Sequence, residues 1–121
     1  MDFRLVFKLF LVCLLGEVLM AEGLACNWGT RATHLLPPDI VVKLMKDNGI
    51  DKVKLFEVVP DVMRALGNSG IQVMVGIPND MLASLASSVR VAEDWVTQNV
   101  SRYVSRNGVD VRLVLAFFIY P

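Results

Sequence analysis

Between residue 25 and residue 116, apolar residues follow two alternating patterns. Four short stretches are apolar or alternate between polar and apolar residues, as strands do: residues 25–30, 52–56, 71–75 and 109–116. Between them, apolar residues recur every three to four positions, as on one face of a helix, over residues 37–47, 60–65 and 89–104. Strands that alternate with helices form a parallel sheet. We therefore expect an α/β fold with four parallel strands in chain order and three helices.

The clearest helix-to-strand unit is residues 37–57. Proline is favoured in the first turn of a helix, and a glycine just past the end can close it; residues 37–38 and Gly49 provide both signals. We expect its buried face to carry Ile40, Val41, Leu44 and Met45. The spacing in the last helix predicts a buried face made of Val89, Ala92, Val96, Val100, Tyr103 and Val104.

Residues 1–25 have the pattern of a secretory signal peptide: a short basic start, an apolar run, then small residues. Cleavage after Gly23 and cleavage after Ala25 both satisfy the small-residue rule, and both remain open. An uncleaved membrane anchor is disfavoured because the apolar run falls short of the ~20 residues that a spanning helix needs. We expect a secreted chain with one domain over residues 26–121.

Charge and cysteine content exclude several function classes. Lys plus Arg and Asp plus Glu each total 12, so no basic face indicates a nucleic-acid partner. Cys13 would leave with the leader, and a lone Cys26 permits no internal disulfide; we expect it to be a small buried apolar residue. The one histidine, His34, lies in a loop without paired ligand spacing, so we expect neither a metal site nor a cofactor.

Four polar or aromatic positions are candidates for function. Trp28 ends the first strand, where a core role is favoured over a sugar-stacking role. Asn79 and Asp80 follow the third strand; they could cap the next helix, or they could lie where α/β barrels place their chemistry. Asn99 begins a formal glycosylation sequon, but helical spacing puts it inside the apolar arc, which disfavours its use. Glycines 67 and 70 follow a helix, so they do not form a phosphate loop.

Several motifs together resemble plant glucan endo-1,3-β-glucosidases of glycoside hydrolase family 17: Asn27-Trp28-Gly29-Thr30, Leu36-Pro37-Pro38-Asp39-Ile40-Val41-Val42-Lys43-Leu44, Val53-Lys54-Leu55-Phe56-Glu57 and Val73-Met74-Val75-Gly76-Ile77-Pro78-Asn79-Asp80-Met81-Leu82. The resemblance runs from Cys26 to about Val114. It implies a secreted (β/α)8 barrel that hydrolyses β-1,3-glucans with retention of configuration; some longer relatives are membrane-anchored. On this basis residues 26–121 are the N-terminal part of such a barrel, with a divergent apolar tail at 117–121.

The resemblance also implies site residues. Trp28, Phe56 and Asn79 map onto the sugar-binding rim, with β-1,3-glucan as partner. In the family, the catalytic acid is the glutamate of a Gly-Asn-Glu-Pro motif that ends the fourth strand. This chain instead continues from Ala116 as Phe-Phe-Ile-Tyr-Pro, and the residues before the proline at 60, Val58-Val59, also depart from the family pattern.

Retaining hydrolysis requires two carboxyl groups about 5 Å apart, one an acid and one a nucleophile. Glu57 and Asp80 are the acids expected near the ends of neighbouring strands, and we do not favour them as a substitute pair. We therefore assign no catalytic residue and expect a truncated, inactive member of the family. The alternative is a non-catalytic product, either a weak glucan-binding module or a chain with no independent function.

Overall fold

The computed structural model describes residues 2–8 and 23–116, and residues 3–8 form a short helix. Most of the expected leader and the tail at 117–121 therefore lie outside the described residues. From residue 23 onward the elements are, in chain order, β1 (Leu24–Trp28), α2 (Pro38–Asp47), β2 (Ile50–Leu55), α3 (Pro60–Leu66), β3 (Gln72–Ile77), η1 (Asn79–Met81), α4 (Leu82–Ser87), α5 (Val89–Val96), η2 (Thr97–Ser101), α6 (Arg102–Asn107) and β4 (Asp110–Ala116).

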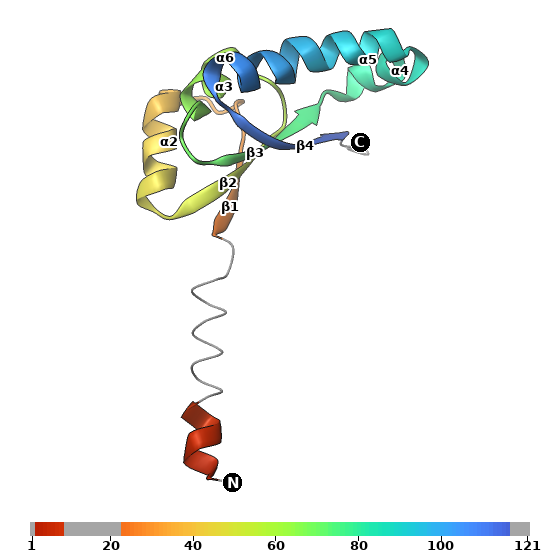
Figure 1. Ribbon diagram of the computed structural model, residues 1–121. Helices are drawn as coiled ribbons and strands as arrows, with labels where there is room; N and C mark the ends of the chain where they lie inside the picture. Colours follow the sequence, from red (N-terminus) through yellow and green to blue (C-terminus); the bar gives the residue numbers. More distant parts are fainter. Residues whose placement is uncertain (1, 9–22, 117–121) are drawn as a thin grey trace.

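The four strands form a single sheet in the order β1-β2-β3-β4, and every neighbouring pair is parallel. This confirms the expected strand order and direction. The helices α2, α3 and α6 lie along one side of the sheet, while α4 and α5 extend past the end of β3 (Figure 1). Each of the two outer pairs contains one register shift, and in β4 the extra residue is Arg112.

The core lies between the sheet and the helices. Alternate strand residues face it, because successive side chains of a strand point to opposite sides. Val53, Leu55, Val73 and Val75 are all at most 2% exposed, as expected, whereas Val114 is only half-buried because β4 is an outer strand. Met63 and Leu66 of α3 complete the most deeply buried part.

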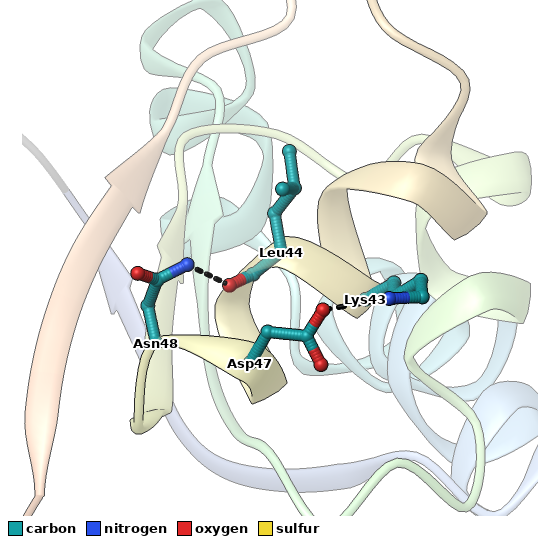
Figure 2. Close-up of polar contacts among 4 residues, drawn as sticks. All are labelled: Lys43, Leu44, Asp47 and Asn48. Carbon is teal, nitrogen blue, oxygen red and sulfur yellow. Dashed lines mark hydrogen bonds and ion pairs between the residues drawn. The ribbon is translucent and has the colours of Figure 1, made fainter.

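Helix α2 begins and ends as its sequence predicts. Pro37 is the N-cap and Pro38 the first helical residue, and Gly49 has a positive φ of 71° just after the helix. At the C-terminal end, the Asn48 side chain donates a hydrogen bond to the Leu44 carbonyl at 2.7 Å (Figure 2). The backbone N–H of Asn48 also donates to this carbonyl, at 3.2 Å, so the last turn of the helix is held by two hydrogen bonds from one residue.

One residue earlier in the chain, the Lys43 ammonium forms an ion pair with the Asp47 carboxylate at 2.7 Å (Figure 2). The hydrogen bond and charge of Asp47 raise the pKa of Lys43. Both side chains are more than half exposed, so this pair adds little to stability.

The face of α2 that we expected to be buried is partly wrong. Val42 and Met45 are buried and Val41 is half-buried, whereas Ile40 and Leu44 are 42% and 47% exposed. The reason is coverage: within the described residues α2 packs mainly against α3 and β2, with Cys26 of β1 against Met45, and these contacts leave Ile40 and Leu44 exposed. Amphipathic spacing indicates which residues can be buried, but the neighbouring elements decide which ones are.

The helix expected over residues 89–104 begins at Val89, as predicted, and two short segments, η1 and α4, lie between β3 and this helix. A 3-10 turn, η1, comes first and Pro78 precedes it; neither Asn79 nor Asp80 makes a capping hydrogen bond, so that expectation was wrong. Helix α5 begins after Ser88, whose hydroxyl accepts a hydrogen bond from the Val91 amide at 3.4 Å. The extended backbone at Ser88 separates α4 from α5, so the apolar periodicity that starts at Val89 marks the start of this helix correctly.

The buried face of this last helix matches the expected one only in part, at Tyr103. Trp95 and Tyr103 are 7% and 5% exposed, while Val89, Val96 and Val104 are 76%, 41% and 44% exposed. Between the two aromatics, Thr97–Ser101 forms a π-helical turn. A π-helical turn contains more residues than an α-helical turn, so each residue rotates the chain through a smaller angle about the helix axis. Two aromatic residues eight positions apart therefore face the same side. Ideal helical spacing cannot anticipate such a turn.

Candidate functional site

All four strands are parallel, so their carboxyl ends lie along one edge of the sheet. In α/β barrels this edge carries the chemistry, because the loops that follow the strands converge there. Here the loop after β1 carries Thr30, the loop after β2 carries Phe56 and Glu57, and the turn after β3 carries Asn79. The structure therefore places two of the three expected rim residues, Phe56 and Asn79, just beyond strand ends.

Strand register places Trp28 on the helix-covered face. Trp28 pairs with Leu55, and register partners in a parallel sheet point to the same side. Leu55 is 1% exposed in the core, and Trp28 is half-buried and packs against that core. This is the position of a core residue, in line with the interpretation that the sequence favoured.

Phe56 lies on the opposite, open face of the sheet. It follows β2 directly, two positions after Lys54, and its side chain is 42% exposed. The Lys54 ammonium lies over the Phe56 ring, 5.2 Å from the ring centroid. A cation over one ring face holds an aromatic in place by its quadrupole. The result is an exposed aromatic surface at the carboxyl-end edge of the sheet, held to β2 by Lys54.

Thr30 and Glu57 connect two loops at this edge. The Thr30 hydroxyl donates a hydrogen bond to Glu57 Oε1 at 2.6 Å, between two half-buried side chains. Asp80, the other acid expected here, lies exposed in η1. Glu57 is therefore engaged in structure as a hydrogen-bond acceptor, a role that strand position alone did not reveal.

The open face also contains a cavity of about 580 Å³. Its polar lining is rich in hydrogen-bond donors: Asn27, Lys52, Lys54, Gln72 and Arg112. Arg112 is paired with Asp110 at 2.6 Å. Asn27 pairs in register with Lys54 and so shares the open face with it. The sequence interpretation overlooked Asn27, although strict alternation with the core residues Cys26 and Trp28 would have pointed to it.

The remaining candidate positions lie away from this edge. The Asn99 side chain is half-buried in the π-helical turn and donates a hydrogen bond to the Trp95 carbonyl at 2.9 Å. His34 is exposed in the loop before α2, as expected. Cys26 is half-buried, and burial raises the pKa of its thiol.

Two searches of the described residues bear on other kinds of site. Across residues 2–8 and 23–116, no three side chains of the ligating types His, Cys, Asp and Glu come together as a metal site would require. In the same ranges, no helix combines the length and the apolar character needed to cross a membrane.

Comparison with known proteins decides the family. The model of glycosyl hydrolases family 17 matches residues 24–116, from the first residue of β1 to the last residue of β4. The chain belongs to glycosyl hydrolase family 17. The resemblance found in the sequence is thereby confirmed.

Individual members of glycosyl hydrolase family 17 are closely similar to this chain. Glucan endo-1,3-beta-glucosidase 5 of Arabidopsis thaliana is 55% identical over 117 residues, which cover 94% of this chain and 24% of that protein. Glucan endo-1,3-beta-glucosidase 9 of the same plant is 57% identical over 100 residues, covering 83% and 20%. The chain thus spans a fifth to a quarter of the length of these relatives.

Solved structures of the family confirm the fold class. One of two plant beta-glucan endohydrolases with distinct substrate specificities superposes with a TM-score of 0.72 at 34% identity, over 77% of this chain and 29% of that one. The described sheet is therefore four consecutive parallel strands of a TIM barrel, with their helices on the outside. The open face is the side that faces the barrel interior.

Proposed function

We propose that this chain contributes the first part of a β-1,3-glucan-binding cleft in a family 17 glucan hydrolase. Membership of the family supports the substrate class, and relatives that the chain matches over most of its length are named as glucan endo-1,3-beta-glucosidases. The observation that carries the proposal is Phe56, an exposed aromatic at the carboxyl end of β2, on the side that faces the barrel interior.

The residues at this edge would have different tasks in the cleft. The exposed part of the Phe56 ring would stack on the apolar face of a glucose unit, because sugar C–H groups pack against aromatic rings. Asn79, exposed beside the end of β3, would exchange hydrogen bonds with sugar hydroxyls through its amide. Trp28 would have an indirect role: it packs against the core and would support the loop that follows β1.

We further propose that the 121-residue polypeptide binds glucan without hydrolysing it. A retaining mechanism needs a protonated acid and a nucleophilic carboxylate about 5 Å apart. The Gly-Asn-Glu-Pro motif that holds the acid in the family does not occur among these residues. Glu57, the acid next to the aromatic platform, is bound by Thr30. The hydrolytic groups of the complete barrel would then come from outside these residues.

The test is electrophoresis of the native chain through gels that contain laminarin, a soluble β-1,3-glucan, or dextran as a control polymer. We expect laminarin alone to retard the chain, and Phe56→Ala to weaken the retardation about tenfold, as loss of a central aromatic contact does. Leu44→Ala is the matched control, since Leu44 is similarly exposed but lies on α2. Equal retardation by both polymers would refute the substrate class.

The same preparations, assayed for released reducing ends, test the second statement. We expect no release from laminarin by the 121-residue chain, because loss of catalytic groups in hydrolases costs ~10⁶-fold in rate. Turnover that disappears in Glu57→Gln would instead make Glu57 a catalytic group.

We also propose that residues 1–25 direct the chain into the secretory pathway and are then removed. The basic start, the apolar run and the small residues at its end support this. The mature protein would then act outside the cell, where β-glucans of the cell wall are accessible.

A further inference from the structure

We propose that Thr30 and Glu57 are positioning residues that hold the loops after β1 and β2 together, and so fix the orientation of the Phe56 platform for glucan. The proposal rests on the glucan-binding function and goes beyond it, because it assigns a task to two side chains that do not themselves stack on sugar. It also gives the Glu57 carboxylate a role other than acid or nucleophile.

The hydrogen bond itself is short and shielded. Thr30 Oγ1 lies 2.6 Å from Glu57 Oε1, and both side chains are half-buried. A hydrogen bond to a carboxylate is stronger than one between neutral groups, and partial burial strengthens it further. The contact joins residues 27 positions apart in sequence, so it restrains two loops that local structure leaves independent.

The chain around this contact shows how the restraint reaches Phe56. Glu57 follows Phe56 directly, just beyond the last residue of β2, so fixing the Glu57 side chain limits the backbone torsions next to the ring. On its other side, Phe56 is held from below by the Lys54 ammonium. The ring is therefore restrained from the strand and from the loop, and an oriented ring loses less entropy when a sugar binds.

Four substitutions in the full 121-residue chain separate the hydrogen bond from charge and from shape. Thr30→Val keeps the shape of threonine and removes the donor, whereas Thr30→Ser keeps the donor. Glu57→Ala removes the acceptor, whereas Glu57→Gln keeps an acceptor oxygen and removes the charge. If the two residues act by positioning, the conservative variants Thr30→Ser and Glu57→Gln should retain glucan binding.

The first measurement is affinity for laminarin by electrophoresis at low micromolar protein. We expect Thr30→Val and Glu57→Ala to weaken binding about threefold to tenfold, the typical effect of one lost hydrogen bond. Thr30→Ser and Glu57→Gln should stay within about twofold, and the Val/Ala double variant should be no weaker than either single variant. Leu44→Ala serves again as the exposed control.

The second measurement is amide hydrogen exchange of the loops at 29–37 and 56–59, without glucan. We expect faster exchange in both loops in Thr30→Val and in Glu57→Ala, with no further increase in the double variant. This readout does not need glucan binding. If the wild-type chain fails to bind laminarin, the proposed function fails, and exchange alone decides whether the two residues couple the loops.

Three results would overturn the inference. Glu57→Gln as damaging as Glu57→Ala would mean that the carboxylate charge acts on the sugar directly. Unchanged binding and exchange in Thr30→Val would mean that the contact restrains nothing. Additive exchange effects in the double variant would show two independent side chains rather than one shared hydrogen bond.

Discussion

The Cys26 thiol of β1 donates a hydrogen bond to the Met45 sulfur of α2 across 3.5 Å. This contact connects an outer strand of the sheet to the helix that follows it in sequence. Thiol and thioether are both soft, apolar groups, and they fill the gap between strand and helix. Burial raises the pKa of the Cys26 thiol above its ordinary value of 9.0, so folding favours the protonated form.

This leads to a prediction of slow thiol chemistry. In a Cys13→Ser background, Cys26 should react with an aromatic disulfide reagent severalfold more slowly in the native chain than in the denatured chain, because the thiolate is the nucleophile. Equal rates in the two states would contradict the packing described here.

The same shift predicts a pH dependence of stability. The folded state holds the Cys26 proton more tightly, so its contribution is complete below pH 9.0 and is lost as pH rises through the higher pKa of the folded state. Urea denaturation at a series of alkaline pH values measures this. Cys26→Ala should flatten the decline, and an identical decline in that variant would show that other groups cause it.

Gly67→Ala should destabilise the fold. A Cβ atom at Gly67 would overlap the backbone carbonyl oxygen of Asn107, so the end of α3 and the end of α6 could not approach as they do. Overpacking of this kind costs about 1–3 kcal/mol. Gly29→Ala is the matched control because it meets no atom within 4 Å, and its free energy of unfolding should change by no more than ~0.5 kcal/mol.

Trp95→Ala should be among the most damaging substitutions in the last helix. Its side chain is 7% exposed, and truncating a buried tryptophan costs about 3–5 kcal/mol. Val89→Ala, at a position 76% exposed, should be within ~0.5 kcal/mol of wild type. Denaturation midpoints of the two variants measure the difference. A larger loss of stability in Val89→Ala than in Trp95→Ala would contradict this burial and favour the helix face that periodicity alone predicts.

Export should produce a mature chain that begins at Leu24. Cleavage after Gly23 leaves β1 whole, whereas cleavage after Ala25 removes its first two residues, including the Leu24 that pairs with Ile50. N-terminal sequencing of secreted protein, carrying a C-terminal reporter, tests this. An intact Met1 on exported protein would refute cleavage of the signal peptide. A mature chain that starts at Cys26 would refute cleavage after Gly23.

The contrast between what the sequence predicted and what it missed is clearest at the strands and helices around Phe56. Strand order followed from alternation, because consecutive β/α units joined by short crossovers have few ways to pack. Helix faces were less predictable: Ile40 has the spacing of a core residue, yet no described element covers it. Amphipathic spacing describes one helix, whereas burial depends on its neighbours.

The candidate site was predictable in position and less so in detail. Motif similarity placed Phe56 and Asn79 at strand ends, where the structure has them. The bond between Thr30 and Glu57 joins loops that are distant in sequence, and nothing in either loop alone indicates it. Trp28 illustrates the reverse case: its position at a strand end fits a rim residue, but register with Leu55 turns it toward the core.

The order of the sheet has a consequence for how the protein is made. Every described strand pairs only with the strand before or after it in sequence, so each new β/α unit leaving the ribosome finds its docking edge already formed. Contacts between sequence neighbours form quickly and do not wait for distant segments. The N-terminal units could then assemble one by one during synthesis, and the last finished strand would wait, unpaired on one side, for whatever is translated next.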